Sequence, residues 1–277
     1  MRRTIALAAL LVLPGCDIQV NDKGVSIDIA EGRATDEWSR TYTIAPGGSL
    51  EIGNVNGPIQ VVPAAAAQVE VTASRRVNAA STEQARAFLQ AVEMLEETAP
   101  DRVSVQARVD RGEEGRFGQR PQLNIEYLVK LPPGLNASFK TENGGVRLEN
   151  VEGTLAAAST NGGITSRGIS GSLKASTVNG GLQIDMARVA GDVDVTTVNG
   201  GVRLELPADV NGSLDARAVN GGISVDDRFP LASAERERLR VAGRLNAGGP
   251  RIAAQTTNGG VRVVVRGQGA APDGPPR

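Results

Sequence analysis

The chain repeats Ser159-Thr160-Asn161-Gly162-Gly163-Ile164 as Thr177-Val178-Asn179-Gly180-Gly181-Leu182, and the phrase returns twice more before residue 225. The asparagines of these four copies are spaced by 18, 20 and 21 residues. A fixed period of about 20 residues is the signature of a repeat architecture. With the outlying copies, the phrase supplies seven asparagines: Asn56, Asn143, Asn161, Asn179, Asn199, Asn220 and Asn258.

Apolar and polar positions alternate when the copies are aligned on the asparagine. The position six residues earlier is always apolar, and so is the position three residues later: Leu155, Leu173, Val193 and Leu214, then Ile164, Leu182, Val202 and Ile223. A period of two residues indicates strands with one buried face, and no helical spacing fits these columns.

Two folds use such a pattern. Asn-Gly is a strong hairpin signal, so each copy could be the tip of an antiparallel hairpin. Alternatively, each copy is one coil of a parallel stack, which explains why every column holds one size class of side chain. We therefore expect an all-β fold, a single-stranded parallel β-solenoid with coils of about 18–21 residues. In it the asparagines would form an amide ladder, and the glycines would supply positive φ at the corner.

The solenoid domain is predicted to span residues 41–266, with a first coil at Gly48–Val61. Pro58 replaces the second glycine there, which suggests an edge coil because proline has no N–H to donate. An insertion, 63–131, carries a predicted helix over 81–98, where Ser81 and Gln84 form a capping box. A side loop follows at 226–249, with a possible short helix at Ser233–Arg240, and a disordered Gly/Pro-rich tail is expected at 267–277.

The N-terminus resembles a bacterial lipoprotein signal peptide over residues 1–15, followed by an anchor and tether at 16–40. Arg2-Arg3 precedes a short apolar run that stops at Leu13-Pro14-Gly15-Cys16, although Pro14 departs from the usual lipobox residue. The resemblance implies acylation, including palmitate, on Cys16, the single cysteine of the chain. The protein would then be membrane-anchored in the cell envelope, facing the periplasm or the exterior. Asp17 resembles an inner-membrane retention signal, but the choice of membrane stays open.

Composition excludes several classes of function. The chain has no histidine, so histidine-based acid–base catalysis and histidine-ligated zinc are excluded. The formal net charge is −1 and there is no polybasic block, which argues against nucleic acid as a partner. No cofactor motif is present, because the Gly-Gly pairs precede strands rather than helices.

One set of carboxylates could carry chemistry. Asp194 and Asp215 share an outward column on consecutive copies, and Asp192 lies on the same face. Stacked carboxylates about 5 Å apart would match a retaining glycosidase pair or hold Ca²⁺. A solvated face of mixed charge explains them equally well. A second outward column holds Arg147, Arg203 and Arg262 but is interrupted by Thr165, Gln183 and Ser224.

The repeated Thr-x-Asn-Gly-Gly phrase resembles the bacterial putative-adhesin family of β-strand-repeat proteins, over roughly Thr41–Val265. The resemblance implies a parallel β-solenoid at the cell envelope, in adhesion or envelope sensing. Our first hypothesis is a putative adhesin or binding scaffold, lipid-anchored and non-enzymatic, that binds a protein or glycan. Two alternatives stay open: an envelope-stress accessory protein acting through a membrane partner, and a polysaccharide-acting β-helix enzyme. The sequence indicates neither the oligomeric state nor the ligand.

Overall fold

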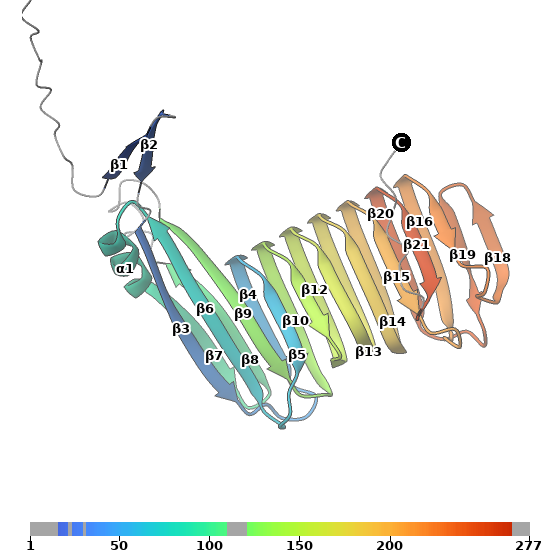
Figure 1. The fold of residues 1–277 in the computed structure, drawn as a ribbon. Coiled ribbons are helices and arrows are strands. Elements are labelled where there is room, and N and C mark those ends of the chain that lie inside the picture. Colours follow the sequence, from blue (N-terminus) through green and yellow to red (C-terminus); the bar gives the residue numbers. More distant parts are fainter. Residues whose placement is uncertain (1–15, 22–23, 30–31, 110–120, 268–277) are drawn as a thin grey trace, which may run out of the picture.

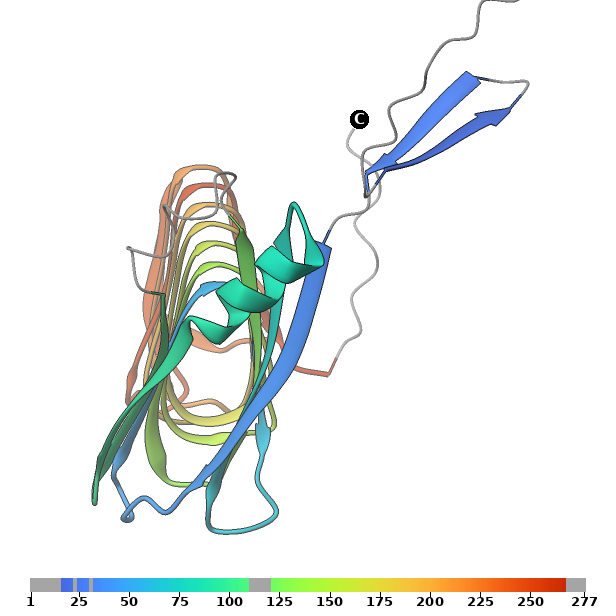
Figure 2. The same cartoon turned by 90° about the vertical axis from the view of Figure 1, so that its left-hand side faces the viewer.

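The computed structural model describes residues 16–21, 24–29, 32–109 and 121–267. Strands dominate it (Figure 1). Two of them, β1 (Cys16–Asn21) and β2 (Gly24–Ile29), pair antiparallel as a separate small sheet. The other strands belong to one 19-stranded sheet, which is curled on itself so that its two halves face each other across the core (Figure 2).

Parallel pairing relates the repeat copies. The strands that lead up to the asparagines pair in register, for example Leu155 with Leu173 and Leu173 with Val193. Seven strands carry the repeat in this half: β4 (Ser49–Asn56), β10 (Leu135–Asn143), β12 (Glu152–Asn161), the last parts of β13 (Ile164–Asn179) and β14 (Leu182–Asn199), β20 (Arg251–Asn258) and β16 (Gly212–Asn220).

The strands that follow the Gly-Gly pairs stack in the same order on the other side of the core. They are β5 (Ile59–Pro63), β11 (Val146–Glu149), the first parts of β13 and β14, then β15 (Val202–Leu206), β21 (Val261–Val265) and β17 (Ile223–Val225). Inward side chains alternate with outward ones in both halves, and the inward ones form a continuous aliphatic core.

The spatial order of the copies differs from their order in the sequence. β20 pairs with β14 on one side and with β16 on the other, so the last copy lies between the Asn199 and Asn220 copies. Figure 1 shows the C-terminal strands inside the row rather than at its end. Residues 226–249 make the detour that leaves this position free for the last copy.

The sheet is of mixed direction, and the expectation of a single-stranded parallel β-solenoid is therefore wrong. In the insertion, β6 (Val69–Ala79) pairs antiparallel with both β3 (Gly32–Tyr42) and β9 (Gln122–Leu131), and β7 (Val92–Ala99) with β8 (Arg102–Val109). At the other end, β19 (Arg240–Leu245) runs antiparallel to β16 and to β18 (Leu231–Glu237). The alternating pattern shows which face of a strand is buried, but not the direction of its neighbour.

The helix α1 spans only Thr82–Gln90, so the predicted end at residue 98 is wrong. Ser81 caps it, because its Oγ accepts a hydrogen bond from the N–H of Gln84 at 3.2 Å. Ala85, Phe88 and Leu89 are buried in a small satellite core. The next eight-residue stretch forms strand β7, because pairing with β8 satisfies its backbone groups and outweighs its helical spacing.

Two smaller expectations are also wrong. Residues 233–240 form no helix but belong to the β18–β19 hairpin, which covers the edge of β16. Pro58 lies in an interior coil, since β5 pairs with both β9 and β11. The coil-to-coil bonds use the N–H of the first glycine and of the residue after the second one, as in Gly144 N to Asn161 O and Val146 N to Gly163 O. A proline in the second position therefore removes no bond of this pattern.

Candidate functional surface

The seven repeat asparagines lie in one row along the corner of the coils. Six of the side chains, all but that of Asn56, donate from Nδ2 to the Oδ1 of the asparagine on the adjacent coil, at 2.8–2.9 Å. In spatial order the row is Asn56, Asn143, Asn161, Asn179, Asn199, Asn258 and Asn220. Every hydrogen bond in the row has the same direction, with the donor on the side of Asn220. The Oδ1 of Asn220 therefore has no asparagine donor and ends the row as an acceptor.

A second row of hydrogen bonds lies beneath the first and is buried. The hydroxyl two residues before the asparagine donates to the carbonyl oxygen of the first glycine on the adjacent coil, as from Thr197 to Gly180 at 2.9 Å. The donors are Thr141, Ser159, Thr177, Thr197 and Thr256. All five are buried, and the Asn220 copy has Ala218 in this place. Aligning the copies on the asparagine shows this column of Ser and Thr residues, but we did not predict the hydrogen bonds that their hydroxyls make.

The first glycine of each corner is required by close contact with the adjacent coil. A Cβ on Gly180 would lie 2.3 Å from the carbonyl oxygen of Gly162, and a Cβ on Gly200 would lie 2.1 Å from that of Gly180. Positive φ, the reason expected from the sequence, occurs at Gly57, Gly221 and Gly259 but not at Gly180. The second glycine has more room, since a Cβ on Gly181 would lie 3.6 Å from the oxygen of Gly201.

Exposed valines lie beside four of the seven asparagines. The residue just before the asparagine is Val55, Val178, Val198 or Val219 in four coils, with exposed fractions of 51%, 42%, 39% and 59%. Only Val178 and Val198 lie on adjacent coils, because the other three coils have Glu142, Thr160 and Thr257 in this position. The valines provide small apolar patches beside the polar amide row.

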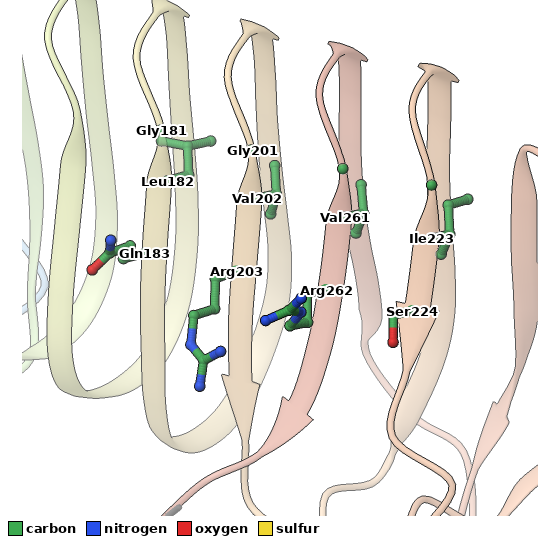
Figure 3. Close-up of a pocket in the computed structure, with 12 residues that line it drawn as sticks. Gly181, Leu182, Gln183, Gly201, Val202, Arg203, Ile223, Ser224, Val261 and Arg262 are labelled. Atoms are coloured by element: carbon green, nitrogen blue, oxygen red, sulfur yellow. The ribbon is translucent and has the colours of Figure 1, made fainter. Parts of the chain in front are cut away.

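Beyond the corner, four coils line a depression with a volume of about 550 Å³. Gln183, Arg203, Arg262 and Ser224 contribute polar side chains to it from β14, β15, β21 and β17 (Figure 3). Arg203 and Arg262 are direct cross-strand partners because the last copy inserts beside β15. The guanidinium of Arg203 is also held by its own strand, with Nε donating to Glu205 Oε1 at 2.8 Å.

The structure does not bring the predicted carboxylates together. Ala253 lies between Asp194 and Asp215, because β20 separates their strands. Two strand spacings amount to about 10 Å, too far for the predicted pair. Arg147 is likewise separated from Arg203, by β13 and β14.

Each of these carboxylates is engaged by a basic or backbone group. Asp192 Oδ1 accepts from the N–H of Arg251 at 2.9 Å, and Asp194 lies 3.9 Å from the Arg251 guanidinium. Asp215 accepts from Arg217 and from Arg240. The hydrogen bond from Arg217, with a smaller contribution from Arg240, lowers the pKa of the Asp215 carboxyl. Across the described residues, no three potential ligands gather into a metal-binding group.

The predicted signal peptide, residues 1–15, lies outside the described residues, as does nearly all of the predicted tail. Cys16 begins β1, and nothing in the structure tests its acylation. Within the described part of the chain, no helix is both long and apolar enough to cross a membrane.

These features define an all-β protein whose repeats stack into a curled sheet with a flat polar corner. The chain belongs to the family described as Toastrack DUF4097, whose model matches residues 18–264. No curated protein matches the chain. The family assignment gives no information on the predicted lipoprotein signal.

Several solved structures are similar to this one. A protein named a putative cell adhesion protein, from Clostridium sporogenes, is 11% identical with a TM-score of 0.41, over 83% of this chain and 100% of its own. A putative adhesin from Bacteroides fragilis is 12% identical with a TM-score of 0.31, over 83% of this chain and 97% of its own. A putative lipid binding protein from Parabacteroides distasonis is 10% identical with a TM-score of 0.26, over 84% of this chain and 97% of its own. Two of these three proteins are named as a putative cell adhesion protein and a putative adhesin.

Proposed function

We propose that the protein is a lipid-anchored binding scaffold of the cell envelope that works without catalysis. The observation that carries this proposal is the depression that four adjacent coils line with Gln183, Arg203, Arg262 and Ser224. Guanidinium and amide groups suit the carboxylate, hydroxyl and carbonyl oxygens of a protein or glycan partner. The exposed side chains of Val178, Val198 and Val219, on three of these four coils, add apolar contact area.

The composition and the carboxylate contacts support a role in binding rather than in catalysis. The chain contains no histidine, and its single cysteine is the predicted lipid attachment site. Asp192, Asp194 and Asp215 are each engaged by arginine or backbone groups. The hydrogen bond from Arg217 lowers the pKa of the Asp215 carboxyl, which makes that group a poor general acid at neutral pH.

The anchor is tested by metabolic labelling with palmitate and by membrane fractionation of the Cys16→Ala variant. Attachment of acyl chains at Cys16 would hold the protein stably, since each buried CH₂ contributes about 0.8 kcal/mol. We expect label and membrane association in the natural protein and loss of both in the variant. Label that persists in the variant would contradict the proposed attachment site.

The binding surface is tested by placing a photo-crosslinking side chain at Gln183, in living cells. The matched control is Thr154, which is exposed on the half of the sheet before the corner. We expect a discrete adduct from position 183 and none from position 154. Equal adducts at both positions, or none at either, would contradict a binding role for the depression.

A further inference from the structure

The ends of the described sheet differ in how they are protected. A free strand edge exposes unpaired N–H and C=O groups, and proteins commonly protect it with charged side chains. Three edge strands with one pairing partner each are rich in charge: β3, β7 and β18. The edge strand β17 pairs only with β21 and consists of Ile223, Ser224 and Val225, without a charge.

Side-chain exposure shows that the corner end of this edge is uncovered. Ile223 is partly exposed, whereas its counterparts in the six other copies are buried: Ile59, Val146, Ile164, Leu182, Val202 and Val261. Val219, at the same corner, is the most exposed large apolar residue recorded in the described chain. A Cβ built on Gly222 would meet no atom within 4 Å.

The repeat pattern specifies which groups this edge offers. In the other coils, the first glycine donates its N–H to an asparagine carbonyl, and the residue after the second glycine donates to a glycine carbonyl, as Gly259 and Val261 do toward the Asn220 copy. No further coil follows β17 among the described residues, so the N–H groups of Gly221 and Ile223 have no such acceptor. The Oδ1 of Asn220 likewise lacks the amide donor that its counterparts have. The carbonyl of Gly221 lacks the hydroxyl donor that the first glycine has in five other coils.

We propose that the corner and strand from Asn220 to Val225 form a strand-addition site for an extended segment of a partner protein. The segment supplies a side-chain amide donor to Asn220 and then runs along β17, pairing its backbone with the free N–H groups. It begins at the corner, because β19 already covers the preceding strand through Ala218 N to Leu239 O.

The polarity of the asparagine row favours a different protein over a second copy of this chain. Two copies meeting at this end would present Asn220 Oδ1 to Asn220 Oδ1, two acceptors without a donor. The donor end of the row, at Asn56, is covered by β9: Asn54 Nδ2 donates to the Ile125 carbonyl at 2.7 Å, and a Cβ on Gly57 would lie 2.2 Å from that oxygen.

The experiment uses the full chain in detergent micelles and a synthetic peptide with the sequence of residues 178–185, Val-Asn-Gly-Gly-Leu-Gln-Ile-Asp. Amide hydrogen exchange at Gly221 and Ile223 is followed by NMR with and without the peptide. A control peptide has Asp in place of Asn, which removes the amide donor. We expect slower exchange at both amides with the first peptide and a loss of that effect with the second.

A blocked variant provides the second test. In the other coils the Cβ direction of the second glycine points toward the next coil, as for Gly260 toward the Gly222 oxygen at 3.3 Å. Gly222→Lys therefore fills the site without disturbing the fold, and Thr154→Lys adds the same charge at an exposed position on the other half of the sheet, outside the site. We expect Gly222→Lys to abolish the peptide effect and Thr154→Lys to retain it.

Two results would overturn the proposal. One is unchanged exchange at Gly221 and Ile223 in the natural protein, or an effect that persists in Gly222→Lys. The other is protection that grows with protein concentration in the absence of peptide, which would mean that a second copy occupies the edge. The inference rests on the proposed binding role, but the crosslink at position 183 can succeed while the peptide fails, so the two failures are distinguishable.

Discussion

At the scale of single residues, two rows of hydrogen bonds hold the coils together at the corner, and they differ in burial. The asparagine amides are exposed and compete with water, whereas the hydroxyls of the second row are buried. A lost partner leaves a buried carbonyl unsatisfied, which costs more than the loss of an exposed bond. The buried hydroxyl row therefore stabilises the corner more per bond than the amide row that the sequence makes conspicuous.

Replacing Thr256 by valine tests this difference. Thr256 is 4% exposed, and its Oγ1 donates to the Gly200 carbonyl at 2.8 Å. Because valine keeps the shape and removes the donor, we expect a loss of about 1–3 kcal/mol in the free energy of unfolding, measured by urea denaturation. The adjacent Thr257→Val is the matched control and should change stability by less than about 0.5 kcal/mol. Equal effects would show that the hydroxyl bond does not matter.

At the scale of the elements, each corner is shaped by how closely the adjacent coil approaches. From the sequence we expected glycine at the corners because it can adopt positive φ. At Gly180 the structure gives a different reason, since a Cβ there would lie 2.3 Å from the carbonyl oxygen of Gly162. A turn that needs positive φ and a close contact with a neighbouring coil both require glycine, so the sequence does not distinguish the two causes. The position of the neighbouring coil in the structure does.

The Gly180→Ala and Gly181→Ala variants separate the two corner positions. Backbone atoms cannot move aside as a flexible side chain can, so we expect Gly180→Ala to destabilise the fold by about 3 kcal/mol, the upper end of the usual overpacking cost. Gly181→Ala places its Cβ at an ordinary contact distance and should be tolerated. Melting temperatures of the two variants give the comparison. Similar losses in both would contradict the steric account.

The contact between β16 and β19 predicts an acid dependence of stability. The arginines beside Asp215 lower its pKa in the folded state, so its stabilising contribution is present above the unfolded pKa of about 3.9 and disappears as pH falls through the folded value. Asp215→Asn should therefore be less stable than the natural protein at pH 7, with a difference that shrinks below about pH 4. Urea denaturation across pH measures it. A difference independent of pH would point to packing rather than charge.

At the scale of the whole molecule, the out-of-order last copy decides which outward residues meet. It separates Asp194 from Asp215 and brings Arg203 next to Arg262. The same insertion makes β17 the last strand of its half of the sheet. Both the depression and the uncovered edge depend on this single exchange of order.

Engineered disulfides test the order directly, with Cys16 replaced by serine. Arg203 and Arg262 are cross-strand partners, and adjacent strands place Cα atoms about 5 Å apart, within the range of a disulfide. We expect Arg203→Cys with Arg262→Cys to cross-link on oxidation. Arg203→Cys with Ser224→Cys joins copies consecutive in the 151–225 stretch but separated by β21, and should stay reduced. If instead only Arg203→Cys with Ser224→Cys cross-linked, the copies would lie side by side in their order along the sequence.

The sequence by itself determined the repeated strands, their buried columns and the Asn-Gly-Gly corners, because alternation and turn chemistry are local. The tertiary structure alone decided the sheet's mixed direction, the strand at residues 92–99 and the place of the last copy. Copies with the same columns of side chains fit beside one another almost equally well, so pattern cannot choose among neighbours. The choice comes from the lengths of the connections and from hydrogen bonds between distant segments, and it leaves Asn220–Val225 at an open edge.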